Sequence, residues 1–226
     1  MGWKRDEIIK AAYHLLETIP PSVMVVAAAK QRTYDEVETV IQAGITHIGH
    51  NYIQEAQEMV NILGDKATWH MIGHLQRNKA AHAVRLFDMI ETLDSVRLAA
   101  TIGAHCGQIG KVMPVLIEIN SAREANKTGI LPEEVEDLLV AITDMKHIHV
   151  EGVMTMGPLS DNPEDFRPYF RTTREVFERL SALTLPNVTM RYLSMGMSDS
   201  YHIALQEGAN IVRIGTKLFG PRDIKT

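Results

Sequence analysis

Short apolar runs alternate with amphipathic stretches along the whole chain, and this alternation limits the possible folds more than any other feature. Apolar runs of this length are typical of buried strands, and the stretches between them have helical spacing. We expect eight strands, at residues 23–29, 46–49, 69–72, 89–92, 112–119, 148–154, 191–194 and 211–214. We expect helices at 34–43, 53–63, 79–87, 94–107, 132–143, 163–181 and 199–207, with an extra one at 5–18 before the first strand.

Eight strands separated by helices predict parallel pairing through crossover connections. Closing the sheet gives an α/β protein of the (β/α)8 TIM-barrel class with an extra N-terminal helix. An open doubly wound sheet is the alternative, because the sequence carries no strand-order information. The sequence contains no repeat or linker, and barrels of about 200–250 residues are commonly single domains. We therefore expect residues 1–226, which are 45% hydrophobic, to form one domain.

The first apolar run, "VMVVAAAK", ends on Lys30. Side chains alternate across a strand, so this lysine shares a face with Ala28, Val26 and Met24. The carboxyl ends of barrel strands form the catalytic mouth, and burial there disfavours a charged amine. A neutral amine is a nucleophile that condenses with an aldehyde or ketone to form a Schiff base. The alternative is a lysine that simply reaches solvent, as most lysines at strand ends do.

Two later segments, "LSMGMSDSYHIALQEGA" and "NIVRIGTKLFG", each run from a strand into a Gly-containing turn and then a helix or loop. Gly196 allows backbone N–H groups to approach an anion closely, and Ser198 is one of three candidate caps of the following helix. Gly215 and Thr216 repeat this arrangement. The two turns follow the seventh and eighth strands, where barrels often bind phosphate. A phosphate site beside a mouth lysine predicts a ligand with a carbonyl and a phosphate, and pyridoxal 5′-phosphate fits.

Seven segments together resemble the pyridoxal phosphate homeostasis proteins, single-domain relatives of the barrel half of bacterial alanine racemase. The segments are "VVAAAK", "GHNYIQE", "WHMIGHLQRNK", "INSAREANKTGI", "GVMTMG", "LSMGMSDS" and "VRIGTKLFGPR". They cover nearly the whole chain, from Val25 to Arg222. The resemblance implies a protein that holds pyridoxal 5′-phosphate as a lysine Schiff base and maintains the cofactor supply of the cell.

The resemblance also implies a set of cofactor-binding residues. Lys30 carries the Schiff base, Asn51 lies close to the cofactor and His70 lines the pocket. Arg213 approaches the pyridine nitrogen. The phosphate is surrounded by Ser194, Ser198, Gly215 and Thr216, while Met195 and Gly196 line the same end of the pocket. Lys127, in "NKTG", matches a family lysine near the mouth that is associated with cofactor transfer.

Arg213 shares a strand face with Ile211 and Gly215, so its guanidinium is expected to point inward. An arginine is effectively always protonated, and a cation that faces the pyridine nitrogen disfavours protonation of the ring. An unprotonated pyridine is a poorer electron sink, which argues against aminotransferase or decarboxylase chemistry. The alternative is a structural arginine bonded to carbonyl groups.

Racemisation is the alternative function. Alanine racemases resemble this barrel but use a tyrosine base on a C-terminal β domain, whereas this sequence ends at Thr226, shortly after the eighth expected strand. We expect a carrier without turnover and assign no catalytic residue. A third reading is a phosphate-sugar barrel enzyme without pyridoxal.

Three positions depart from the family pattern. His50 stands where Glu is common, and Ala29 stands where Ser precedes the lysine. Gln31 and Arg32 replace a segment that usually contains a second lysine. We expect cofactor binding to survive these changes, with His50 altering the charge near the ring edge.

Two further constellations have simple explanations. His47 and His50 point to different sides of their strand, and a Gly turn separates His70 from His74, so we expect packing or pocket histidines and no metal site. The acids of "LFDMIETLDSVRLA", which include Glu91, are expected in a solvated loop at a strand end, and paired carboxylates for acid–base chemistry are the alternative.

Composition restricts the partners. With 23 basic and 28 acidic residues the formal charge is −5, which gives no attraction to nucleic acid or membrane surfaces. The single cysteine, Cys106, is consistent with a reducing compartment, and the charged N-terminal stretch does not resemble a signal peptide. We expect a cytoplasmic monomer or weak dimer, with apo forms of pyridoxal phosphate enzymes as candidate partners.

Overall fold

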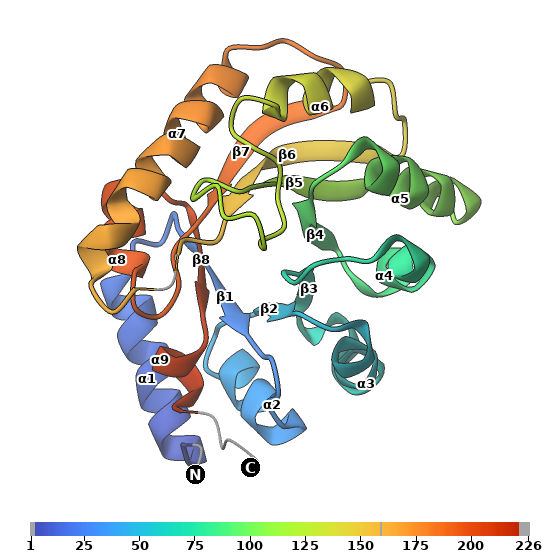
Figure 1. The fold of residues 1–226 in the computed structure, drawn as a ribbon. Helices are drawn as coiled ribbons and strands as arrows, with labels where there is room; N and C mark the ends of the chain where they lie inside the picture. Colours follow the sequence, from blue (N-terminus) through green and yellow to red (C-terminus); the bar gives the residue numbers. More distant parts are fainter. Residues whose placement is uncertain (1–2, 159, 222–226) are drawn as a thin grey trace.

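The computed structural model describes residues 3–158 and 160–221. Each strand pairs in parallel with the next one along the chain, and the eighth pairs with the first, so the sheet is a closed barrel (Figure 1). The predicted (β/α)8 barrel is therefore confirmed, and the open-sheet alternative is wrong. The strands are β1 (Met24–Ala28), β2 (His47–His50), β3 (Thr68–Met71), β4 (Met89–Leu93), β5 (Met113–Ile119), β6 (Ile148–Thr155), β7 (Val188–Ser194) and β8 (Ile211–Ile214).

Every expected helical stretch contains a helix, and these helices surround the barrel (Figure 1). They are α1 (Arg5–Thr18), α2 (Tyr34–Gln42), α3 (Ile53–Leu63), α4 (Ala80–Leu86), α5 (Val96–Gln108), α6 (Val135–Ile142), α7 (Arg167–Ser181) and α8 (Tyr201–Gln206). A short 3-10 turn, η3 (Pro163–Phe166), leads into α7. The sequence analysis missed three short elements, η1 (Gly64–Lys66), η2 (Arg77–Lys79) and α9 (Thr216–Phe219). No helix in the described ranges is both long and apolar enough to span a bilayer.

Local sequence signals explain some helix starts and not others. Thr33 caps α2 as expected, because its hydroxyl accepts a hydrogen bond from the Glu36 N–H while the Glu36 carboxylate accepts one from the Thr33 N–H. By contrast, α6 begins at Val135, three residues after Pro132. Ser198 does not cap α8, which begins at Tyr201 without a side-chain cap.

The barrel interior contains both apolar and polar side chains. Six buried apolar residues, five in strands and Ile72 directly after β3, form a cluster separate from the larger core between the sheet and the helices, which identifies them as inward-facing. They are Val26, Ile72, Met89, Leu116, Met154 and Ile211. The same interior contains the polar side chains of His70, Glu91, Ser194 and Arg213, all at most 3% exposed. Glu91 and Arg213 follow Met89 and Ile211 on their strands and Ser194 ends β7, so these three polar residues lie toward the carboxyl ends of the strands, where the candidate site is found.

Candidate functional site

Lys30 lies two residues beyond the end of β1, on the face that continues Met24, Val26 and Ala28 into the barrel mouth. Its side chain is half-buried, and its Nζ lies 5.3 Å from the ring centroid of Tyr52 in the turn between β2 and α3. A cation at this distance from an aromatic face is attracted by the ring. The amine is thus held at the mouth and remains accessible from outside.

The turn after β8 presents two backbone donors to one point. The N–H groups of Gly215 and Lys217 both donate to the hydroxyl of Ser198, each over 3.2 Å. Ser198 is only 5% exposed, whereas Thr216 is exposed at the start of α9. Ser198, Gly215 and Thr216 therefore lie together, as expected, in an arrangement of donors that suits an anion.

The Ser198 hydroxyl and the N–H groups of Gly215 and Lys217 that converge on it are called the cup from here on. Lys30 and the cup follow neighbouring strands, β1 and β8. In the β1–β8 ladder Ala27 pairs with Ile214, so Ala28 is level with Gly215. A Cβ added at Gly215 would lie 3.7 Å from the Ala28 Cβ. Lys30 therefore rises from the mouth directly beside the turn that carries the cup.

Gly196 has a structural reason for being glycine. Its φ is +92°, and an added Cβ would lie 2.5 Å from the Ala204 Cβ on α8. Its carbonyl accepts a hydrogen bond from the Arg213 N–H. The glycine thus lets the strand β7 turn sharply against α8, which brings Ser198 to the cup.

The expected position of Met195 is not what the structure shows. Ser194 points into the barrel, so the next side chain points outward, and Met195 is fully buried in the core between sheet and helices. Met195 therefore supports the strand and does not line the mouth.

A chain of hydrogen bonds crosses the interior beneath the mouth. Arg213 donates to the Ser194 hydroxyl over 2.6 Å and to the Thr155 carbonyl over 2.8 Å. Ser194 bonds to Glu91 over 2.6 Å, and Glu91 bonds to His70 over 2.8 Å. Arg213 thus points inward as expected. His70 and Ser194 are buried in the barrel interior, and the Ser194 hydroxyl is already bonded to these buried partners.

Glu91 corrects the sequence analysis. It does not lie in a solvated loop; it lies within β4 and is fully buried. Burial alone would raise its pKa. The hydrogen bond from His70, the charge of Arg213 and the Ser194 hydroxyl outweigh burial and hold the pKa of Glu91 below its ordinary value. Sequence reasoning missed this residue, although a glutamate inside an otherwise apolar run is itself a signal of a specific buried partner.

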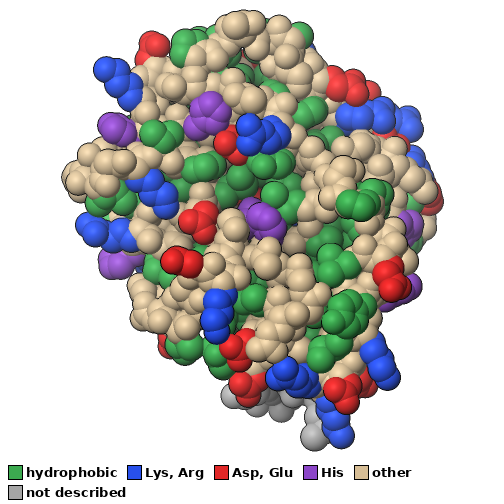
Figure 2. Space-filling model, turned by 180° about the vertical axis from the view of Figure 1, so that it is seen from behind, with side chains coloured by type: hydrophobic (Ala, Val, Ile, Leu, Met, Phe, Trp, Pro, Cys, Tyr) green, Lys and Arg blue, Asp and Glu red, His purple; other side chains and the backbone are tan. Residues whose placement is uncertain are grey.

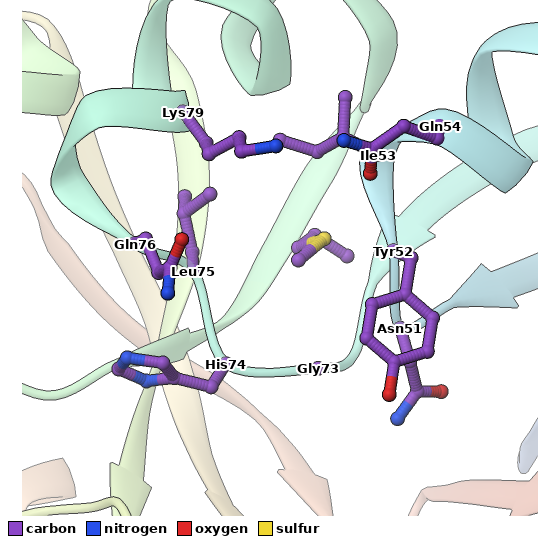
Figure 3. A pocket seen from close by; sticks show the side chains of 10 residues that line it. Asn51, Tyr52, Ile53, Gln54, Gly73, His74, Leu75, Gln76 and Lys79 are labelled. Atoms are coloured by element: carbon purple, nitrogen blue, oxygen red, sulfur yellow. The ribbon is translucent and has the colours of Figure 1, made fainter.

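Asn51 lies at the rim, in the turn after β2. It lines a hollow of about 320 Å³ between the β2–α3 turn and the loop after β3. Figure 3 shows Asn51 and Tyr52 on one side of this hollow and His74 and Gln76 on the other, with Gly73 between them. A Cβ at Gly73 would lie 2.5 Å from the Asn51 carbonyl oxygen, so a side chain there would displace Asn51.

His47 and His50 point to different sides of β2 as expected, His47 inward and His50 outward. His47 reaches His70 over 2.9 Å, and burial lowers the pKa of His47 to about 4. His50 is fully buried and stacks on Trp69 with ring centroids 6.0 Å apart. It therefore lies outside the mouth and has no part in charge near a bound ring. Within the described ranges, no group of three or more His, Cys, Asp or Glu is arranged to hold a metal ion.

Lys127 lies in the loop after β5. Its Nζ donates to Glu124 over 2.6 Å and to the Gly157 carbonyl over 3.2 Å. It lines a second hollow together with Glu118, whose pKa is raised by burial. Lys127 therefore lies on the β5–β6 side of the mouth, away from the β1 side that carries Lys30.

Comparison with known proteins gives consistent results at three levels. The family model of the alanine racemase N-terminal domain matches residues 8–223. A pyridoxal phosphate homeostasis protein of Aquifex aeolicus is 37% identical over 207 residues, which cover 91% of this chain and 84% of the relative. A protein of the same name from Schizosaccharomyces pombe is 33% identical, over 89% of this chain and 85% of the relative.

Solved structures agree. PipY of Synechococcus elongatus superimposes with a TM-score of 0.88 without pyridoxal phosphate and 0.86 with pyridoxal phosphate bound. Its identity to this chain is 31% and 30% in the two structures, each covering 94% of this chain and all of PipY. An alanine racemase of Clostridium difficile has a TM-score of 0.78 at 15% identity and shares the fold over 57% of its own length.

Proposed function

Because the chain belongs to the alanine racemase N-terminal domain family and, within it, to the pyridoxal phosphate homeostasis proteins, we propose that it binds pyridoxal 5′-phosphate and maintains the cofactor supply of the cell. Lys30 is the amine that holds the cofactor as a Schiff base. The observation that carries this proposal is the placement of Lys30 beside the cup formed by Ser198, Gly215 and Lys217. The relative with pyridoxal phosphate bound supports it.

The residues at the mouth fit this cofactor. Pyridoxal phosphate supplies an aldehyde that condenses reversibly with an amine, and its phosphate is a dianion. The backbone N–H groups of Gly215 and Lys217 already converge on one acceptor, and a phosphate oxygen is a stronger acceptor than the Ser198 hydroxyl that they now serve. Arg213, below the mouth, is the cation that we assign to the ring nitrogen.

We place the remaining assignments at the rim of this site. Asn51 and Thr216 flank the cofactor at the β2 and β8 sides. The half-buried Lys30 leaves the cofactor accessible to apo forms of pyridoxal phosphate enzymes, which are the recipients that we propose. The setting is the cytoplasm, and the protein acts as a monomer or weak dimer. Figure 2 shows basic and acidic side chains interspersed over one face of the molecule, without the broad basic patch that a nucleic acid needs.

Borohydride reduction followed by peptide mapping tests the proposal. The protein is titrated with pyridoxal phosphate, reduced and digested, and the cofactor mass is expected on Lys30. Lys30→Ala is expected to lose the covalent adduct and to keep weak binding through the phosphate cup. The matched control is Lys127→Ala, which is expected to keep the adduct at full stoichiometry.

Two outcomes would contradict the assignment. A Lys30→Ala variant with a reducible adduct of native stoichiometry would show that another lysine carries the cofactor, and Lys127 is the first to examine. If the wild-type protein shows no new absorption band with excess cofactor, the proposed function itself is wrong.

Turnover separates the carrier from an amino-acid racemase. We propose that the protein only binds and hands on its cofactor. Incubation of the loaded protein with L-alanine or L-serine in deuterated water is expected to leave the α-proton and the chirality unchanged. Deuterium incorporation with loss of chirality would establish the racemase alternative.

A further inference from the structure

Five inward-facing side chains from five strands form one continuous hydrogen-bonded chain through the barrel. The order is His47, His70, Glu91, Ser194 and Arg213, and the successive distances are 2.9, 2.8, 2.6 and 2.6 Å. The last four are almost completely buried. Buried polar groups are costly unless they are paired, so a chain of this length in the interior calls for a role.

The chemistry of the groups fixes the direction of three of these bonds, and a neutral His70 sets the direction of the fourth. Arg213 can only donate, so the Ser194 oxygen accepts from it, and the Ser194 proton is left for Glu91. A carboxylate can only accept, so His70 donates from Nδ1 to the other oxygen of Glu91. With His70 neutral, its Nε2 atom is left as an acceptor and receives the proton on Nδ1 of His47. Every proton in the chain therefore points toward Glu91, which orders the groups on both sides.

The charges of the buried groups also indicate that Glu91 is the partner of Arg213. Arg213 is buried, and burial lowers its pKa while the nearby charges of Glu91 and Glu118 oppose that effect. The two carboxyl groups differ. Glu118 has its pKa raised by burial and one buried oxygen without a partner in the described chain, whereas the Glu91 carboxylate is held ionised by its partners. Glu91 is thus the counter-charge of the Arg213 guanidinium.

We propose that Glu91 is a positioning residue, which aims Arg213 at the ring nitrogen of the cofactor through Ser194. The inference rests on the proposed function, because it concerns how the same site recognises the pyridine ring. Glu91 orients the Ser194 hydroxyl, and that hydroxyl and the Thr155 carbonyl fix two guanidinium nitrogens. These two bonds use two of the five N–H donors of the guanidinium and leave the others for a ligand. Without Glu91 the arginine keeps its charge and loses its fixed direction.

The test compares two ligands that differ only at the ring nitrogen. One is pyridoxal 5′-phosphate, and the other is its analogue in which a benzene C–H replaces the pyridine nitrogen. Both carry the aldehyde and the phosphate. The wild-type protein is expected to bind the pyridine ligand about tenfold more tightly, the size of one hydrogen bond to a charged group. Glu91→Gln is expected to reduce this ratio to less than about threefold, because the amide places an NH2 donor at one of the two positions that accept from His70 and Ser194.

The matched control is Thr92→Val, one residue further along β4. Thr92 is also buried, and its hydroxyl donates to the Gly73 carbonyl over 2.8 Å without joining the hydrogen-bonded chain around Glu91. This variant loses a buried hydrogen bond of the same strand and is expected to keep the tenfold ratio. If Glu91→Gln does not fold, Ser194→Ala breaks the same link and is expected to reduce the ratio in the same way.

A second readout needs no cofactor. Nitrogen-15 spectra of the histidine rings are expected to show His70 protonated at Nδ1 in the wild-type protein. A proton on Nε2 alone would overturn the proposed direction of the chain.

The outcomes separate this inference from the function beneath it. If Glu91→Gln keeps the tenfold ratio, or loses affinity for both ligands equally, Glu91 is structural only and the inference is overturned while the function stands. If the wild-type protein does not distinguish the ligands, Arg213 does not read the ring nitrogen, and the inference also fails. If the wild-type protein binds neither aldehyde, the proposed function itself is wrong.

Discussion

At the scale of the single residue, the hydroxyl of Ser198 determines whether the mouth is ready for an anion. It holds the N–H groups of Gly215 and Lys217 on one point, 3.2 Å away in each case. Backbone donors that are left without an acceptor in a buried turn are costly, and a turn without an acceptor relaxes to find one. Ser198 therefore keeps the cup in its binding geometry before the ligand arrives.

We expect Ser198→Ala to weaken phosphate binding about tenfold, because without the hydroxyl the N–H groups of Gly215 and Lys217 no longer converge before the ligand binds. The size corresponds to one hydrogen bond to a charged group. The measurement is the Kd for pyridoxal phosphate and for inorganic phosphate, by calorimetry, in a Lys30→Ala background. That background removes the covalent contribution, so the phosphate side is measured alone.

Ser200→Ala is the matched control. The Ser200 hydroxyl accepts from the Met197 N–H over 3.2 Å, within the same turn but away from the cup. This variant is expected to change the Kd less than about twofold. An equal loss in both variants would show that the turn as a whole, and not the Ser198 hydroxyl, determines the affinity.

Residues whose role follows from their place after a strand can be predicted from the sequence, whereas residues whose role depends on distant partners cannot. Lys30 and Ser198 follow strands directly, so their place in the chain already puts them at the mouth. Glu91 depends on partners that are 21 and 103 residues away, His70 and Ser194. Only closure of the barrel brings them together, and a single glutamate near a strand end is more often solvated.

At the scale of the element, helix α9 shows what local patterns cannot reveal. It has four residues, too few for helical periodicity. Its carboxyl end is held by Arg32, whose guanidinium donates to the Phe219 carbonyl over 3.2 Å and to the Gly220 carbonyl over 2.6 Å. Arg32 also pairs with Glu36 on α2. Arg32, which departs from the family pattern close to Lys30, thus holds the carboxyl end of α9, and the amino end of α9 contributes the Lys217 N–H to the cup.

We expect Arg32→Lys to lower the free energy of unfolding by about 2 kcal/mol, because an ammonium cannot reproduce the fork that binds two carbonyl groups. The Kd for pyridoxal phosphate is expected to rise several-fold, since α9 presents the Lys217 N–H. Urea unfolding and ligand titration measure the two effects.

The control is Arg5→Lys, which alters an exposed bond to Gln42 between α1 and α2. It is expected to change neither quantity measurably. Wild-type ligand affinity in Arg32→Lys, together with the loss of stability, would show that the cup does not depend on this anchor.

At the scale of the whole molecule, the order of elements was predictable and the content of the interior was not. All eight expected strands are present, and most were visible as apolar runs because parallel strands buried on both faces are almost continuously apolar. The exception is β7, which is only partly buried and begins at Val188, three residues before the predicted start. Closure places a guanidinium, a carboxylate and two imidazoles, those of Arg213, Glu91, His47 and His70, in one interior. The α1 helix, next to α9 in Figure 1, then packs against the last turn of the barrel.

Folding stability as a function of pH is a further property of the whole molecule, and His50 contributes to it strongly. Neither of its ring nitrogens has a partner among the described residues, and burial lowers its pKa from 6.5 to about 4. Above pH 6.5 the imidazole is neutral in both states, so this group adds no pH dependence. As the pH falls from 6.5 toward 4, His50 is protonated in the unfolded chain but stays neutral in the folded protein. Protons then favour the unfolded state, and folding stability decreases. The full difference is about 3 kcal/mol.

We therefore expect the wild-type protein to lose about 2 kcal/mol more stability than His50→Leu between pH 7.5 and pH 5, as measured by urea unfolding at each pH. At pH 7.5 the free energies of unfolding of the two proteins differ by less than they do at pH 5, because the imidazole is then neutral in both the folded and the unfolded wild-type protein. Trp69→Phe is the control, since it loosens the stacked partner and leaves the imidazole in place, so its stability falls by the same amount at both pH values. If the free energies of unfolding of wild type and His50→Leu change with pH in parallel, the pKa of His50 is not lowered in the folded protein. The imidazole then has a hydrogen-bond partner or a water molecule at the buried face of β2.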